Sequence, residues 1–166
     1  DLPVVVLDAP AGDEPAVVDL AAAAGLGEGR VHVQGALDDA DRAAVFGGAV
    51  AFVAPAVSSA FPWRVVEALT VGVPVVASGS AVHREVVLDG GVFAAAEPGD
   101  GEGALAEASS EAGASGSAGE SLGAELAGVL ASTAAVERFG VLAADRGRAF
   151  SWAGAAERVW QLHADL

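Results

Sequence analysis

Short apolar runs alternate with helical patterns along residues 3–95. The runs predicted as strands are residues 3–7, 30–34, 49–54, 73–77 and 91–95. The segments predicted as helices are residues 13–25, 38–46, 63–71 and 82–87. The run Pro3–Leu7 has no polar interruption, which is typical of a strand buried on both faces. This alternation predicts an α/β fold, a Rossmann-like parallel sheet with right-handed crossovers and helices on both faces.

The pattern changes after Glu97. Residues 98–122 are rich in Gly, Ser, Ala and Glu and almost free of large apolar side chains, so we expect a flexible insertion that is at most weakly helical. Helices are predicted at residues 122–130 and 134–150, and Ser151 is expected to cap a closing helix from Trp152 to about His163. The apolar stripe of this closing helix must dock somewhere, and Trp152 and Trp160 are expected to be packing residues. We therefore predict one domain over residues 1–166.

Composition and charge narrow the possible partners. The chain is 53% hydrophobic, enough for a sizeable core, yet no run of about 18 apolar residues predicts a transmembrane helix. Its net charge of −15 argues against binding to nucleic acid or to an anionic membrane surface. A phosphate ligand would need a local device, such as a helix N-terminus or a well-placed arginine.

Missing residue types carry further information. Without cysteine there are no disulfides and no thiolate chemistry. Lys, Asn, Ile, Met and Tyr are also absent, which indicates the GC-rich genome of a high-GC bacterium and leaves every basic role to Arg. The first residues lack the basic start and the long apolar core of a signal peptide. Because the chain does not begin with Met, we expect a fragment of a longer protein.

Several familiar sites are not encoded. We find neither G-x-G-x-x-G nor a Walker A loop, so no nicotinamide or P-loop site is predicted. A G-x-S-x-G nucleophile elbow is missing as well. His32, His83 and His163 lack the spacing of metal ligands, so no metal site is predicted. His83 is expected to be a surface or partner-contact residue.

The informative stretch is residues 58–77, S-S-A-F-P-W-R-V-V-E-A-L-T-V-G-V-P-V-V-A. A buried strand ends at Pro55, a loop follows, and a helix starts near Trp63. Ligands of open parallel sheets bind beyond the carboxyl ends of strands, where helix N-termini point. Arg64 lies in the first turn, where the helix dipole disfavours a positive charge, and Glu67 follows one turn later. The same spacing also fits a solvated ion pair of about 0.2–0.5 kcal/mol.

This stretch resembles the donor loop of retaining glycosyltransferases with the GT-B fold, in particular the family often called family four, or glycosyl transferases group 1. Their loop typically reads E-G-F-G-L-P-x-x-E-A-M-A-x-G-x-P-V-V-A. Phe61 matches its phenylalanine and Glu67 its second glutamate, and the remaining matches are Ala68, Gly72, Pro74, Val75 and Val76. The segments at residues 30–35, 82–87 and 150–156 are similar to flanking segments of the family. The resemblance covers nearly the whole chain apart from about residues 99–121.

The resemblance implies that the chain is one half of a GT-B architecture, the half that binds a nucleotide-sugar donor such as GDP-mannose or UDP-glucose. Glu67 is then expected to hydrogen-bond the ribose. Further donor-binding candidates are Ser59, Ala60, Phe61, Pro62, Trp63, Arg64 and Gly35. A hexose of mannose or glucose type would be transferred with retention, without a metal or other cofactor, in the cytoplasm or at the inner face of the membrane.

Other features follow from the same resemblance. The amino-terminal acceptor domain, and the Arg and Lys that grip the phosphates, would lie outside this chain, so the fragment alone is expected to be inactive. In the family the closing helix crosses to the other domain. An isolated fragment would expose that helix and form a homodimer through it. The catalytic residues are not identified.

The donor loop departs from the family pattern. Ser59 replaces the first glutamate, Ala60 and Pro62 replace glycines, and Trp63-Arg64 replaces the Leu-Pro pair. Pro62 also removes an amide donor. These changes favour an alternative of another class, a non-catalytic GT-B-like scaffold or partner-binding domain with a degenerate donor site. An epimerase of the same fold, which uses the same donor half, stays open as a third hypothesis.

Overall fold

The computed structural model describes residues 2–57, 60–95 and 114–164, with side chains of the last range described from Ala118 onward. The chain divides into two compact units, Asp1–Val45 and Phe46–Leu166, which we call the first and second units. All strand pairs are parallel, as predicted, but they form two sheets, β1-β2 and β3-β4-β5. The grouping of residues 1–166 into one domain stays a prediction.

The first unit is a small β-α-β arrangement. Strand β1 (Val4–Val6) pairs with β2 (Val31–Val33) in the register Val4 to Val31, and α1 (Glu14–Ala23) connects them. The expectation that β1 is buried on both faces is wrong, because Val4 and Val5 are 45% and 41% exposed. A unit of two strands with one helix has too few elements to cover both faces of its sheet.

The second unit contains the extended core. Helix α2 (Asp39–Gly48) begins in the first unit and ends here, and β3 (Phe52–Ala54), β4 (Val75–Ala77) and β5 (Gly91–Phe93) follow along the sheet. The three residues of β4 are 1%, 0% and 0% exposed, so the central strand is covered on both faces. On one face, Val76 shares an apolar cluster with residues of α5 (Ala114–Val129).

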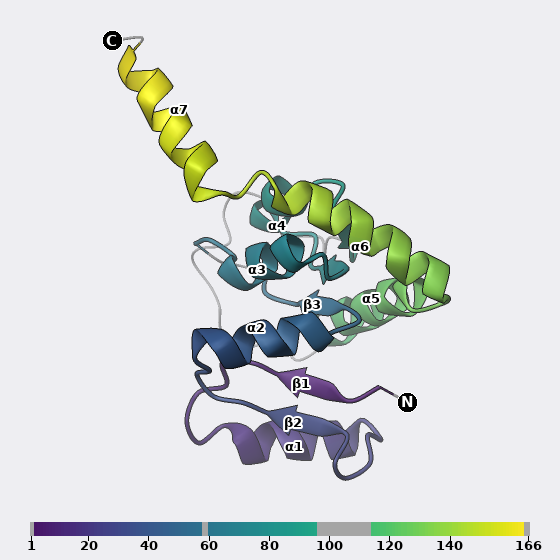
Figure 1. The fold of residues 1–166 in the computed structure, drawn as a ribbon. Coiled ribbons are helices and arrows are strands. Elements are labelled where there is room, and N and C mark those ends of the chain that lie inside the picture. Colours follow the sequence, from purple (N-terminus) through teal and green to yellow (C-terminus); the bar gives the residue numbers. More distant parts are fainter. Residues whose placement is uncertain (1, 58–59, 96–113, 165–166) are drawn as a thin grey trace. The chain divides into compact units, whose positions relative to one another are not determined.

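Helix α3 (Trp63–Val71) has the predicted bounds. Gly72 ends it with a φ of 83°, a left-handed conformation in which only glycine carries no Cβ penalty. Helix α6 (Thr133–Gly147) packs beside α3, as Figure 1 shows. A Cβ on Gly147 would lie 2.5 Å from the carbonyl oxygen of Leu69, so this contact requires glycine. The close approach of the two helices fixes α3, which carries the proposed donor-loop residues Trp63, Arg64 and Glu67.

Helix α4 (Ala81–Val87) is held at its C-terminus by α6. Arg146 donates from Nε to the Val86 carbonyl at 2.7 Å and from Nη2 to the Glu85 carbonyl at 3.1 Å. These carbonyls belong to the last turn, where a helix has no internal donors to offer. The guanidinium group also suits the negative end of the helix dipole.

Replacing Arg146 with glutamine is expected to lower the free energy of unfolding by about 1–2 kcal/mol, because two charge-assisted hydrogen bonds are lost. Denaturation with urea measures the change. Arg148→Gln is the matched control, since Arg148 pairs with Asp145 through side chains that are 77% and 71% exposed. Such a pair contributes about 0–0.5 kcal/mol. Equal losses in the two variants would contradict the capping role.

Helix α5 extends further toward the N-terminus than predicted. Of the expected flexible insertion at 98–122, residues 98–113 lie outside the described residues, whereas α5 is helical from Ala114. Tertiary contacts explain why the described part of this segment is helical. The Ser121 hydroxyl accepts a hydrogen bond from the amide of Ala95 at 2.8 Å, and Leu122 is 9% exposed. These contacts anchor a segment whose own composition only weakly favours a helix.

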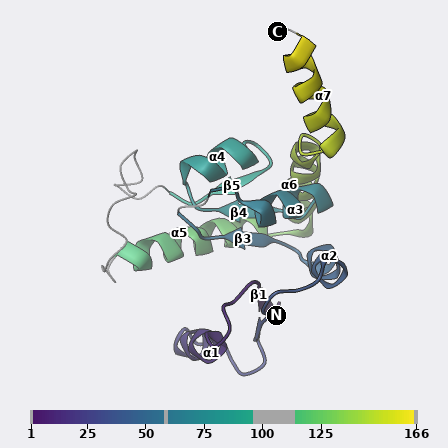
Figure 2. The same ribbon diagram turned by 90° about the vertical axis from the view of Figure 1, so that its left-hand side faces the viewer.

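The closing helix α7 (Trp152–Ala164) forms where predicted, but its packing differs. No residue of α7 is buried, and Trp152 and Trp160 are 84% and 77% exposed, so the expectation that they pack is wrong for this chain. Figures 1 and 2 both show α7 extending away from α3 and α6. Within the described residues no helix covers its apolar stripe.

No single described helix is both long and apolar enough to cross a membrane. The pair Ala118–Val129 and Thr133–Ala164 has the length and composition of a membrane span only when its two parts are taken together, and the pair is bent by 104°.

Candidate functional site

The candidate site lies where the loop after β3 enters α3. Pro62 is buried and occupies the N-cap position of α3, with a φ of −85° and no side-chain capping bond. Its carbonyl accepts hydrogen bonds from the amides of Val65 and Val66 at 3.0 and 3.2 Å. Proline at this position fixes the backbone angle φ, and its missing amide hydrogen leaves no donor unsatisfied at the start of the helix. The local sequence therefore stabilises the start of the helix by restricting the backbone.

Two aromatic side chains flank Pro62. The rings of Phe61 and Trp63 meet edge to face, with centroids 4.7 Å apart and planes at 64°. Phe61 is 41% exposed and Trp63 is 60% exposed. Buried Pro62 therefore lies between two exposed aromatic rings, which give this end of α3 an apolar surface that a ligand can contact.

Arg64 and Glu67 form the ion pair that their spacing allows. Arg64 Nη1 lies 2.8 Å from Glu67 Oε2, and the two side chains are 34% and 31% exposed. In this structure Arg64 is therefore directed to Glu67. The pair brings a carboxylate, a strong acceptor for hydroxyl groups, and a guanidinium group, a strong donor to phosphate, together one turn into the helix.

The remaining three candidates lie in two different parts of the chain. Ala60 is exposed and lies just before Phe61, and Ser59 lies outside the described residues. Gly35 belongs to the first unit, where it follows β2 and is near the Ala9 carbonyl. The second unit thus brings together Phe61, Pro62, Trp63, Arg64 and Glu67.

A cleft of about 210 Å³ beside this loop includes residues that the sequence did not indicate as a site. Phe61 and Trp63 line one part of it, and Phe150, Trp152 and Arg158 line another. These two segments are far apart in the sequence, and only the packing of α6 against α3 brings them together. The sole sequence signal was the F-S-W segment at residues 150–152, which indicated a closing helix.

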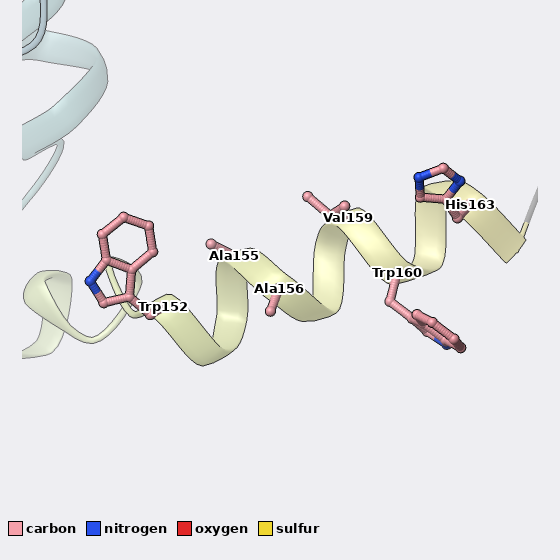
Figure 3. Close-up of a pocket in the computed structure, with 6 residues that line it drawn as sticks. All are labelled: Trp152, Ala155, Ala156, Val159, Trp160 and His163. Atoms are coloured by element: carbon pink, nitrogen blue, oxygen red, sulfur yellow. The ribbon is translucent and has the colours of Figure 1, made fainter.

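The apolar face of α7 is a second surface. Its hollow is lined by residues of this one helix, among them Trp152, Val159 and Trp160. Figure 3 shows Trp152 and Val159 along one edge of this face and Trp160 along the other. Since a single helix cannot enclose a ligand, we interpret this surface as an exposed face for packing.

His83 is buried, with an exposed fraction of 1%, so the expectation of a surface or partner-contact residue is wrong. Its Nδ1 atom lies 2.9 Å from Ser78 Oγ, and the Ser80 hydroxyl accepts from its backbone amide at 3.3 Å. Burial lowers the pKa of His83 below its ordinary value of 6.5, and a hydrogen bond to the backbone of Ser78 opposes that shift in part. The lowered pKa favours the neutral imidazole.

The free energy of unfolding is expected to fall as the pH drops below 6.5, because the unfolded chain then takes up a proton that folded His83 resists. One proton contributes at most about 1.4 kcal/mol per pH unit. The contribution is fully present above 6.5 and is lost as the pH falls toward the lower folded pKa. Denaturation of the wild type and of His83→Asn, which cannot titrate there, measures the difference. Parallel pH profiles would contradict the prediction.

Metal ligands do not gather in the described part of the chain. Among those residues, no three His, Asp or Glu side chains come together in a group that could hold a metal ion. The expectation that transfer needs no metal stays a prediction, and the candidate chemistry rests on the carboxylate of Glu67, the guanidinium of Arg64 and the exposed rings.

Comparisons with known structures support the fold. Sucrose-phosphate synthase from Thermosynechococcus elongatus superposes with a TM-score of 0.71 at 20% identity, over 97% of this chain and 37% of that chain. WaaG, a glycosyltransferase involved in lipopolysaccharide biosynthesis, gives 0.66 at 19%, over 90% and 34%. HepE from Anabaena, in complex with UDP, gives 0.68 at 18%, over 99% and 41%. The chain thus spans about a third to two-fifths of these proteins.

A search of curated proteins found no match to the chain. The model of the protein family described as Glycosyl transferases group 1, however, matches residues 3–113. That range includes the loop, α3 and the strands that position them, and the structural neighbours have the same Rossmann-like half of a GT-B fold. The chain belongs to the glycosyl transferases group 1 family.

Proposed function

We propose that the chain is the donor-binding domain of a retaining glycosyltransferase of family four, which moves a hexose of mannose or glucose type from a nucleotide-sugar to an acceptor. The observation that carries the proposal is the placement of Glu67. Its carboxylate lies one turn into α3, just after the loop beyond β3, and Arg64 holds it at 2.8 Å while leaving it 31% exposed. A carboxylate in this place can accept hydrogen bonds from both ribose hydroxyls.

Arg64 adds to this arrangement. Its guanidinium can hold Glu67 in one rotamer before the ligand arrives, which reduces the entropy lost on binding. The exposed rings of Phe61 and Trp63 offer the donor an apolar surface, and Ala60 and Pro62 of the same unit complete the proposed donor contacts, while the roles of Ser59 and Gly35 stay predictions. HepE, a fold neighbour at 18% identity, was solved with UDP, which makes UDP the first nucleotide to try.

A second candidate function has one observation in its favour. The ion pair with Arg64 occupies Glu67, as expected of a scaffold or partner-binding domain whose donor site has degenerated. Pro62, in place of a glycine, reduces the amides available to a diphosphate. The two functions differ in one respect that can be measured, because only the first requires a nucleotide to bind.

Calorimetric titration of the intact protein with UDP, GDP and ADP tests the proposal. We expect one nucleotide to bind, and its base identifies the donor. The competing nucleotides serve as matched controls, since they share the ribose and the diphosphate. If none of the three binds to the intact protein, the donor-binding function fails and the scaffold function is favoured.

We further propose that the apolar face of α7 packs on an amino-terminal acceptor domain of the intact protein. Trp152, Val159 and Trp160 are 84%, 59% and 77% exposed, which is unusual for large side chains on one helix. The 166-residue chain alone is therefore expected to self-associate. Sedimentation of the wild type and of Trp160→Glu measures this, and a wild-type chain that remains monomeric at high concentration would contradict it.

A further inference from the structure

A chain of hydrogen bonds connects α4 to the root of the proposed donor loop. His83 Nδ1 lies 2.9 Å from Ser78 Oγ, and Ser78 Oγ lies 2.6 Å from the carbonyl oxygen of Ala56. His83 and Ser78 are 1% and 6% exposed. The contacts join residues that are five and 22 positions apart, so tertiary structure creates them.

The chemistry of the three groups sets the direction of these bonds. A serine hydroxyl carries one hydrogen, and a carbonyl oxygen can only accept. Ser78 therefore donates to Ala56, and its oxygen accepts from His83. Neutral His83 must then carry its proton on Nδ1, the tautomer that is less populated for free histidine in water. This assignment can be checked without any ligand.

The endpoint of the chain is a specific place in the fold. Ala56 lies two residues beyond the end of β3, and Ser78 directly follows β4. The backbone amide of Ser78 also donates to the Ala54 carbonyl at 2.9 Å. Ser78 thus holds the departing chain at two successive points, just before the loop that leads to Phe61, Pro62 and Trp63.

A purely structural role would not need this arrangement. An apolar side chain at position 83 would pack against the core with no buried polar group to satisfy. Instead, His83 donates from Nδ1 to the hydroxyl oxygen of Ser78, and that hydroxyl donates to the Ala56 carbonyl at the start of the loop. Buried polar networks that are fully satisfied favour one backbone arrangement over others.

We propose that His83 is a positioning residue for the donor loop, acting through Ser78 to fix the Ala56 carbonyl where the loop leaves β3. This role rests on the proposed donor-binding function. The Ala56 carbonyl lies at the start of the segment that leads to Phe61 and Trp63, so loss of the hydrogen bond should weaken nucleotide binding. His83 itself is not placed in contact with the ligand.

The first arm of the test is nuclear magnetic resonance of the imidazole nitrogens in the 166-residue chain. We expect His83 to show a protonated Nδ1 and a bare Nε2 at pH above 6.5, and we expect Ser78→Ala to reduce the protection of the Nδ1 proton against exchange. The opposite tautomer would overturn the proposal, since Nδ1 could not then donate to Ser78. This arm is independent of nucleotide binding.

The second arm is a double-mutant cycle on nucleotide binding by the intact protein. His83→Leu and Ser78→Ala should each weaken binding about 3- to 10-fold, the fold-change expected for one hydrogen bond. The double variant should bind no more weakly than either single variant, because His83 acts through Ser78. His83→Asn, whose amide can donate from the same position, should restore most of the affinity.

Val87→Ala is the matched control, since Val87 is a fully buried residue of α4 that takes no part in the hydrogen bonds from His83 through Ser78 to Ala56. It should lower the melting temperature while leaving nucleotide affinity unchanged. If the wild type binds and His83→Leu binds as tightly as Val87→Ala, the role of His83 is overturned and the donor function stands. If the wild type binds no nucleotide, the donor function fails and this role falls with it.

Discussion

Replacing Glu67 with alanine is expected to weaken nucleotide binding by the intact protein about 10- to 100-fold. The proposed contacts are hydrogen bonds between the ribose hydroxyls and an ionised carboxylate, which are stronger than bonds between neutral groups. Loss of the carboxylate also removes the group that lies 2.8 Å from Arg64 Nη1. Calorimetric titration of the variant with the nucleotide bound by the wild type measures the change.

The same substitution should hardly affect folding. Arg64 and Glu67 are 34% and 31% exposed, and an ion pair of that exposure contributes about 0–1 kcal/mol after solvent screening. A large loss of affinity with a nearly unchanged melting temperature therefore separates a binding role from a structural one. If the free energy of unfolding falls by several kcal/mol, the loss of affinity reflects misfolding.

Two controls sharpen this prediction. Glu67→Gln keeps the length of the side chain and loses the charge, so it should bind with intermediate affinity. Glu137→Ala removes an exposed carboxylate from α6 and should leave affinity unchanged. If Glu67→Ala binds as tightly as the wild type, Glu67 does not hold the ribose.

Replacing Gly147 with alanine is expected to lower the free energy of unfolding by about 1–2 kcal/mol. The added Cβ would lie 2.5 Å from the Leu69 carbonyl oxygen and 2.6 Å from its carbon. Both are backbone atoms of α3 and cannot rotate away, so one helix must shift, at a cost of about 1–3 kcal/mol or more. That cost outweighs the helical preference for alanine, about 0.5–1 kcal/mol. Urea denaturation measures the net change.

Gly123→Ala is the matched control for this substitution. Gly123 lies within α5, and a Cβ there would meet nothing within 4 Å. The variant should therefore be more stable than the wild type by about 0.5–1 kcal/mol. Changes of opposite sign in the free energy of unfolding would confirm that Gly147→Ala destabilises the protein through the contact between α3 and α6. A general effect of replacing glycine would change both variants in the same direction. Similar changes in both variants would contradict the close approach.

The sequence by itself determined the order and type of most elements. Helix α3 has the predicted bounds because its signals are local: Pro62 limits the backbone at one end, and Gly72 adopts a left-handed conformation at the other. The aliphatic runs predicted the parallel strands, since a strand buried in a sheet needs apolar side chains on both faces. The pairing of Arg64 with Glu67 also followed from spacing along one helix.

Tertiary structure alone decided which of these residues are buried and which lie together. His83 is buried, and Ser78 at the end of β4 supplies a partner for its ring, whereas Trp152 and Trp160 are exposed because no described segment covers α7. The cleft joining Phe61 to Arg158 depends on the packing of α6 against α3. Local patterns encode periodicity and caps, while burial depends on contacts between segments far apart in the chain, and these form only when the chain folds.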